Sequence, residues 1–218
     1  MALKADLYLD QINITRYLPQ KDCVRSCGFS SCCDWLEHLR AGSASVSQCK
    51  ALSPNLAHAL EVVLSLESIL PPVEITQHPV KGILGLHPIN EATPDSPVLV
   101  TGNGSTTQEV MMSILSTTTA PFYLLFVDCL GHTVDMAMVY GTFTPEQLLV
   151  AIEQNELISH VHHRNLILPG VTHSLKDAFG VTTGWEITMG PHCGGELPLY
   201  LGEVWRPPRA QQHNPGVG

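Results

Sequence analysis

Cysteines are the residues of this chain whose type and spacing most directly suggest chemistry. The sequence contains seven, and Cys23, Cys27, Cys32 and Cys49 follow the pattern C-x3-C-x4-C-x16-C. An odd number of cysteines in a chain without an evident export signal argues against a disulfide framework. Structural zinc sites usually use two close pairs, whereas three close cysteines and a distant fourth suit an iron–sulfur cubane. We therefore expect these four thiolates to hold an iron–sulfur cluster; a zinc site and unliganded thiols are the alternatives.

Other reactive side chains give weaker signals. Cys33 directly follows Cys32, so we interpret it as a packing residue or a substitute ligand. Cys129 follows an apolar run and is expected to be a core thiol. Cys193 lies in a PHCGG loop, and no base can be assigned to activate it. The histidines of the HVHH run at 160–163 lack an accompanying carboxylate or cysteine, which favours a surface cluster over a metal site.

The segment that contains the cysteines is expected to be helical between and after them. Residues 33–41 suit a short helix. Ser53 and Pro54 supply an N-cap and a first helical residue, and apolar spacing continues that helix to about residue 70. We expect residues 1–72 to form a cluster module, 73–96 a connector with short strands, 97–205 an α/β domain and 206–218 a mobile tail.

Beyond residue 97, strand and helix patterns alternate. Apolar runs predict strands within 97–102, 122–129, 165–170 and 185–191, and helical patterns lie at 105–115, 144–154, 173–180 and from 196. The alternation predicts a Rossmann-like three-layer α/β sandwich with a mostly parallel sheet. Ligands of such sheets bind beyond the carboxyl ends of the strands, which here fall at 101–107, 128–133, 169–170 and 190–195. These segments are rich in Gly, Pro and small polar residues, so a large ligand could approach the backbone.

Composition excludes several classes of function. Asp and Glu number 20 and Lys and Arg 11, giving a formal net charge of −9, so nucleic acid is not expected as a partner. The longest apolar run is much shorter than a bilayer span, and the first residues do not read as a signal peptide, so we expect a cytoplasmic protein without membrane insertion. Neither the G-x-x-x-x-G-K-[ST] phosphate loop nor a G-x-S-x-G elbow occurs.

The motifs taken together resemble a known family. The cysteine segment YLPQKDCVRSCGFSSCCDWLEHLRAGSASVSQC is followed by VLVTGNGSTTQEV, YLLFVDCLGHTVDMAMVYGTFTPEQLLVAI, HRNLILPG and GWEITMGPHCGGELPLYL. In this order they resemble the large (gamma) subunit of the corrinoid iron–sulfur protein of the CO dehydrogenase/acetyl-CoA synthase pathway. The second part also resembles the corrinoid domain of the mercury-methylating corrinoid protein.

The chain departs from that family at three points. The first cysteine pair is C-x3-C, where the family usually has C-x2-C. The connector is far too short for the TIM barrel that the family carries between its two modules. Met136 stands where the family has a Thr, or the Cys of the mercury-methylating protein. A thioether there is interpreted as a weak axial neighbour of cobalt, as an apolar floor, or, together with Met138, as ordinary core packing.

The resemblance implies two cofactors, a [4Fe-4S] cluster and a cobalamin (corrinoid) bound with its base off the cobalt. The implied activity is that of a methyl carrier in anaerobic one-carbon metabolism, with the cluster reactivating oxidised cobalt; such a chain would be a carrier component of a corrinoid-dependent methyltransferase system more than a complete enzyme. The metal ligands would be Cys23, Cys27, Cys32 and Cys49. The corrinoid contacts would be Thr101, Gly102, Asn103, Thr107, Gly131, His132, Thr133, Val134, Asp135, Met136, Gly170, Gly190 and Pro191.

The implied partners are a methyltransferase or methyl-acceptor protein, a barrel-type subunit, and an electron donor or reductive activator. Two other interpretations stay open. One is an iron–sulfur electron-transfer or assembly protein that no longer binds corrinoid, and the other is a zinc-stabilised α/β interaction module.

Overall fold

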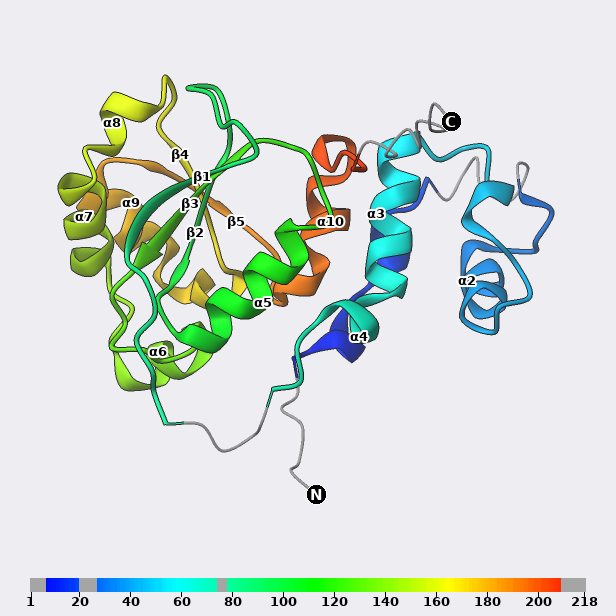
Figure 1. The fold of residues 1–218 in the computed structure, drawn as a ribbon, viewed down its shortest axis with the longest axis horizontal. Helices are drawn as coiled ribbons and strands as arrows, with labels where there is room; N and C mark the ends of the chain where they lie inside the picture. Colours follow the sequence, from blue (N-terminus) through cyan, green and yellow to red (C-terminus); the bar gives the residue numbers. More distant parts are fainter. Residues whose placement is uncertain (1–6, 20–26, 74–77, 209–218) are drawn as a thin grey trace, which may run out of the picture.

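The computed structural model describes residues 7–19, 27–73 and 78–208. Its helices and strands are arranged as an α/β sandwich beside a smaller helical part (Figure 1). The strands are β1 (Gly85–Ile89), β2 (Val98–Gly102), β3 (Phe122–Val127), β4 (Asn165–Leu168) and β5 (Glu186–Met189). The α-helices are α2 (Cys32–Arg40), α3 (Pro54–Leu64), α4 (Leu66–Ile69), α5 (Ser105–Leu115), α6 (Val134–Tyr140), α7 (Pro145–Gln154), α8 (Leu157–His160), α9 (Lys176–Thr183) and α10 (Leu197–Leu201). Short 3-10 turns include η1 (Leu9–Gln11), η2 (Ile14–Tyr17), η3 (Val46–Gln48), η4 (Gly170–Leu175) and η5 (Gly194–Glu196).

The sheet has five strands in the order β1-β3-β2-β4-β5. Neighbours among β3, β2, β4 and β5 are parallel, and β1 pairs antiparallel with β3 at the edge. Every residue of β2 and β3 is buried, because helices cover both faces of the sheet, and this explains why the two strands read as continuous apolar runs. The predicted fold class, an α/β sandwich with a mostly parallel sheet, is confirmed.

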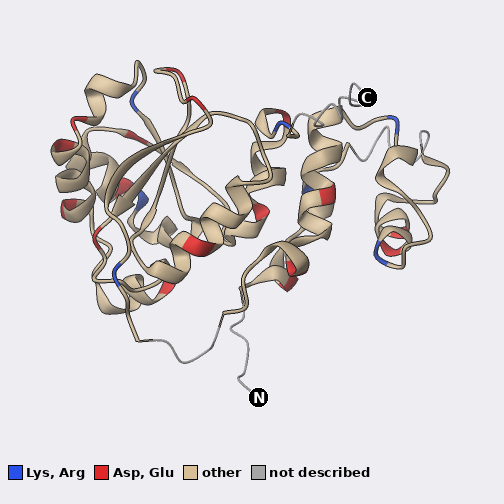
Figure 2. Ribbon diagram, viewed as in Figure 1, with Lys and Arg blue, Asp and Glu red and all other residues tan. Residues whose placement is uncertain are grey.

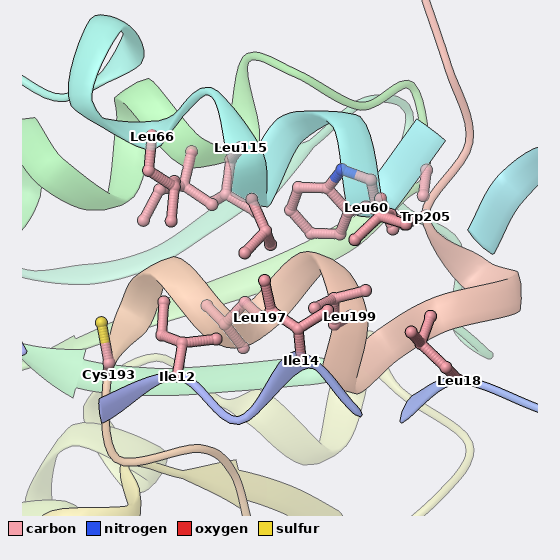
Figure 3. Packing of buried hydrophobic residues seen from close by; sticks show 14 of the residues in the cluster. Ile12, Ile14, Leu18, Leu60, Leu66, Leu115, Cys193, Leu197, Leu199 and Trp205 are labelled. Atoms are coloured by element: carbon pink, nitrogen blue, oxygen red, sulfur yellow. The ribbon is translucent and has the colours of Figure 1, made fainter. Parts of the chain in front are cut away.

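Alternate residues of β2 and β3 contribute to two separate cores. Leu99 and Leu124 face the first core, which the sheet shares with α5, α3, α10 and the cysteine segment. Val100 and Leu125 face the second core, between the sheet and α6, α7 and α9. In Figure 3, labelled side chains of the N-terminal segment, α3, α4, α5 and α10 point toward one another within the first core. The cysteine segment and the sandwich therefore share one continuous apolar interior.

Local sequence signals account for where the helices begin. The Ser53 hydroxyl accepts the Leu56 amide hydrogen at 3.1 Å and Pro54 opens α3, as predicted from the cap and proline. The Thr144 hydroxyl likewise accepts the Gln147 amide hydrogen at the start of α7. These side chains satisfy amide donors that the helix itself leaves unpaired.

Two predicted helix boundaries were wrong. The helix expected to run from residue 54 to about 70 is interrupted at Ser65, which separates α3 from α4. The helix expected to end at Gly180 begins later and continues to Thr183. It ends at Gly184, whose left-handed φ of 69° closes the last turn, so the glycine that caps this helix lies four residues beyond the expected one.

Charged residues are sparse and scattered over the part of the chain that the structure describes. Figure 2 shows acidic residues distributed over several helices and the few basic ones without a common face. Among the described helices, none is both long and apolar enough to cross a membrane.

A candidate ligand cavity and the cysteine segment

A cavity of about 450 Å³ opens at the carboxyl ends of the central strands. The chain leaves β2 for β3 on one side and then passes from β3 to β4 on the other side of β2, so the winding direction reverses between β2 and β4. Thr101 at the end of β2 and Leu168 at the end of β4 both line the cavity. Open α/β sheets bind ligands at such switch points, and this volume is within the usual range of small-molecule sites.

Most of the residues expected to contact a ligand do line this cavity. They are Thr101, Thr107, Gly131, His132, Thr133, Val134, Asp135, Met136, Gly190 and Pro191. They come from the end of β2, the first turn of α5, the loop into α6 and the loop after β5. The topology thus gathers four segments that are distant in sequence, as the parallel sheet predicted.

Hydroxyl groups supply much of the polar lining. Thr101 is only 4% exposed, and its side chain makes no hydrogen bond within the described residues. Thr107 in the first turn of α5 also has no side-chain partner there. Thr133 occupies the N-cap of α6 without capping it. Thr101 is buried, whereas Thr107 and Thr133 are half-buried. Because buried polar groups are normally hydrogen-bonded, the Thr101 hydroxyl is suited to pair with a ligand, and the other two are open to one at the cavity wall.

Asn103 has a different role from the one predicted. It is fully buried and does not line the cavity. Its Oδ1 accepts the amide hydrogens of Cys129 at 2.9 Å and Gly131 at 3.3 Å, and its Nδ2 donates to Asp128 Oδ1 at 3.3 Å. Asn103 therefore fixes the loop that leads into α6, and it positions cavity residues without contacting the cavity itself.

Asp128 and Lys81 extend this network to the surface. Lys81 Nζ lies 3.0 Å from Asp128 Oδ2, and Asp128 Oδ1 accepts the Leu130 amide hydrogen at 2.9 Å. Burial works to raise the pKa of Asp128, but the hydrogen bonds from Leu130, Lys81 and Asn103 hold that pKa below its ordinary value. The carboxylate therefore stays charged and bonded to the loop at neutral pH.

Gly102 and Gly170, which were also predicted to contact the ligand, do not line the cavity. Their role is to allow close packing. A Cβ atom at Gly102 would lie 2.6 Å from Cys129 Sγ, and one at Gly170 would lie 2.8 Å from the His192 nitrogen. Each glycine lets a neighbouring loop approach a strand end closely. Gly131, which does line the cavity, has a φ of 83°, and a Cβ there would lie 2.6 Å from the Lys81 nitrogen.

The two methionines after this loop differ in environment. Met136 lines the cavity and is 39% exposed, so it is not a core residue. Met138, two positions later, is partly buried and packs against the second core. Cys129 is fully buried, as expected of a core thiol, and burial raises the pKa of its thiol group.

Several lining residues were not anticipated from the sequence. Leu7, Tyr8 and Leu9 lie over the cavity, as do residues 78–80. Nothing in the N-terminal residues marks them as part of a site more than 90 positions away. His192 and the residues at 105–106 also line the cavity, and they lie within the segments 190–195 and 101–107 that were expected to face a ligand.

Three of the four predicted cluster ligands are described; Cys23 lies within residues 20–26, which are outside the described residues. Cys32 and Cys49 are buried in the first core, and the half-buried Cys27 packs against it, whereas Cys33 is exposed. Within residues 7–19, 27–73 and 78–208, no three His, Cys, Asp or Glu side chains are arranged to hold a metal ion. The four-cysteine site accordingly stays a prediction.

The histidines at 160–163 face different partners. His162 Nδ1 lies 3.3 Å from Asp95 Oδ1 at the surface, and His163 Nε2 lies 3.0 Å from the Ser96 carbonyl oxygen. The His160 ring packs near Tyr123. The three rings therefore contact separate groups.

Comparisons with known proteins agree with the motifs. Residues 64–201 match the family described as CO dehydrogenase/acetyl-CoA synthase delta subunit. The chain is 32% identical over 129 residues to the acetyl-CoA decarbonylase/synthase complex subunit gamma of Archaeoglobus fulgidus, covering 59% of this chain and 27% of that protein. It is 33% identical over 115 residues to the corrinoid/iron-sulfur protein large subunit of Moorella thermoacetica, covering 53% of this chain and 26% of that protein.

These matches span only about a quarter of the length of the curated relatives. The family match itself covers α4, the whole sheet and α10, which includes every segment that forms the cavity except the N-terminal one. The chain therefore belongs to the CO dehydrogenase/acetyl-CoA synthase delta subunit family.

Proposed function

We propose that this chain is a corrinoid and iron–sulfur methyl carrier of anaerobic one-carbon metabolism. The observation that carries the proposal is the cavity at the sheet's switch point, which is lined by the segments expected to contact a corrinoid. When bound, the corrinoid supplies a cobalt atom that accepts and releases a methyl group, and the cluster supplies single electrons. The residues of the chain bind these groups, orient them and exclude water.

The composition of the cavity supports a large amphipathic ligand. The hydroxyls of Thr101, Thr107 and Thr133 can bond amides or a nucleotide tail, and Val134 and Met136 offer apolar contact. At about 450 Å³ the cavity would hold part of such a ligand, with the remainder outside it. Two methionines line the cavity, and Met136, which is 39% exposed where Met111 is buried, has the more accessible thioether for approach to a metal.

The surroundings of the cysteines support a sulfur-rich group. The indole nitrogen of Trp35 is fully buried and makes no hydrogen bond within the described residues. Trp35 follows Cys32 by three positions on α2, so both side chains lie on the same face of the helix, and both belong to the first core. Leaving a buried donor unpaired costs about 1–3 kcal/mol, and the sulfurs of a bound cluster would supply an acceptor.

The proposal extends to partners. Both relatives' names describe parts of a larger assembly or of a corrinoid and iron–sulfur protein. We propose that this chain works with a methyltransferase or methyl-acceptor protein, with an electron donor or reductive activator, and with a barrel-type subunit in place of the barrel that it lacks. The exposed Met136 side of the cavity is where such a subunit would cover a bound corrinoid.

Metal content and colour test this proposal. The protein should be purified without oxygen, mixed with hydroxocobalamin, freed of excess ligand and assayed for iron, cobalt and zinc. Retention of both iron and cobalt would support the proposal. Iron alone would favour the electron-transfer or assembly protein, and zinc alone the interaction module. Cys32→Ser should lower the iron content, whereas Cys193→Ser should leave it unchanged.

A methionine pair tests the position of the corrinoid. Met136→Ala should alter the visible spectrum of bound cobalamin, because the side chain lines the cavity. Met138→Ala is the matched control, since Met138 packs against the second core and does not line the cavity. Equal spectra for wild type and Met136→Ala would remove this side chain from the neighbourhood of the cobalt.

A further inference from the structure

Residues Leu7–Leu9, here called the strap, lie across the cavity and touch both of its sides. The Tyr8 hydroxyl donates a hydrogen bond to Asp135 Oδ2 at 3.1 Å, in the first turn of α6. The Tyr8 ring meets the His192 ring edge-on, with centroids 5.5 Å apart. Cys193 Sγ donates to the Leu7 carbonyl oxygen at 3.0 Å. The strap thus joins α6 to the loop after β5, and it covers the space between them.

The residues that follow the strap are held much more firmly than the strap itself. Ile12, Ile14 and Leu18 are buried in the first core against α10, as Figure 3 shows. The Tyr17 hydroxyl donates to Glu196 Oε1 at 2.7 Å, and burial, together with this partner, raises the pKa of Tyr17. The strap, in contrast, has no fully buried residue: its three side chains are half-buried, and Tyr8 and Leu9 pack only against the margin of the first core.

The backbone conformation of Tyr8 also makes the closed position of the strap less stable. Its φ of 59° and ψ of 26° place it in the left-handed region, which residues other than glycine, asparagine and aspartate adopt rarely. Such conformations persist only where the surroundings impose them, and they are found at sites that switch. Here the surroundings include the hydrogen bond to Asp135, the ring contact with His192 and packing against the first core. Loss of these contacts would let the backbone relax away from the cavity.

We propose that Tyr8 is a latch that closes the cavity, and that the strap swings open about the anchored residues 12–18 when a ligand enters. The hydrogen bond to Asp135 holds the closed state. The proposed opening and closing of the strap does not depend on which ligand the cavity binds.

Cysteine labelling tests the latch without any cofactor. Cys193 lines the cavity under the Leu7 carbonyl, whereas Cys129 is fully buried and does not line the cavity. Peptide mass spectrometry after timed exposure to iodoacetamide would give a rate for each thiol. Tyr8→Phe keeps the ring and removes the hydrogen bond, so Cys193 should react about two- to tenfold faster while Cys129 does not change.

Control variants separate the latch from general destabilisation. Tyr123→Phe also removes one tyrosine hydroxyl, but from β3 and far from the strap, so it should leave both rates unchanged. Asp135→Ala removes the acceptor and should reproduce the Tyr8→Phe rate, with no further increase in the double variant. Hydrogen exchange of the Gln11 amide, which bonds to the Tyr8 carbonyl oxygen at 3.1 Å, should accelerate in parallel.

Each result decides for or against the latch. A faster Cys193 with an unchanged Cys129 and a faster Gln11 amide supports it. Equal Cys193 rates in wild type and Tyr8→Phe would overturn it, as would a parallel increase at both thiols, because opening would then be global. Repeating the labelling with hydroxocobalamin tests the proposed function separately: absence of any effect of that ligand would count against the corrinoid and leave the latch standing.

Discussion

At the scale of single residues, Asn103 shows how a polar side chain can serve a site without touching its ligand. The position after a strand made it a natural candidate for a direct contact. The structure instead commits its oxygen to two loop amides and its nitrogen to Asp128. The prediction placed Asn103 at the end of β2, where the cavity lies. Sequence alone could not tell a contact from a support, because that depends on how the next loop folds back.

Asn103→Ala should therefore cost stability as well as cavity shape. It leaves two buried amides without their acceptor, so the free energy of unfolding should fall by about 2–4 kcal/mol. Urea denaturation would measure this. Asn165→Ala is the control, since its half-buried amide makes one bond to Thr188 Oγ1 at 3.0 Å, and the loss there should stay below about 1.5 kcal/mol. Equal losses at both positions would show that Asn103 does not organise the loop.

At the scale of elements, two threonines at helix N-caps make a matched pair. Thr144 caps α7, with its hydroxyl accepting the Gln147 amide hydrogen, whereas Thr133 precedes α6 with no such bond. Thr144→Ala should lower the free energy of unfolding by about 1 kcal/mol, and Thr133→Ala should change it little. Thermal or urea unfolding of both variants would check this. A comparable loss at Thr133 would mean that its hydroxyl serves the fold and is not available to a ligand.

The same elements show what the sequence could and could not predict. Buried strands β2 and β3, and the starts of α3 and α7, follow from local chemistry that needs no partner: apolar runs, Ser53–Pro54 and Thr144–Pro145. The interruption of the helix at Ser65 and the continuation of α9 past Gly180 depend on how these helical turns pack against the rest of the protein. The strap escaped prediction altogether, since its role arises only when the N-terminus folds back over the sheet.

At the scale of the whole molecule, the first core raises a question about domain division. Sequence patterns suggest a cysteine module at 1–72 and an α/β domain at 97–205. The first core contains Trp35 of α2, Leu60 of α3 and Leu99 of β2 together, and in Figure 1 α3 stands between α2 and the sandwich. β1, which arises within the expected connector, adds an edge strand to the sheet. These packing relations favour one cooperative unit over two that fold separately.

A truncation of one buried side chain tests that cooperativity. Leu60 is fully buried in α3, so Leu60→Ala should cost about 2–5 kcal/mol through lost contacts and the cavity left behind. If the chain is one cooperative unit, the free energy of opening that hydrogen exchange reports should fall by the same amount at amides of α2, β2 and β3. Val181→Ala, at a side chain 86% exposed on α9, should stay within about 0.5 kcal/mol. Faster exchange confined to α2 and α3, with β2 and β3 unchanged, would show that the cysteine segment unfolds on its own.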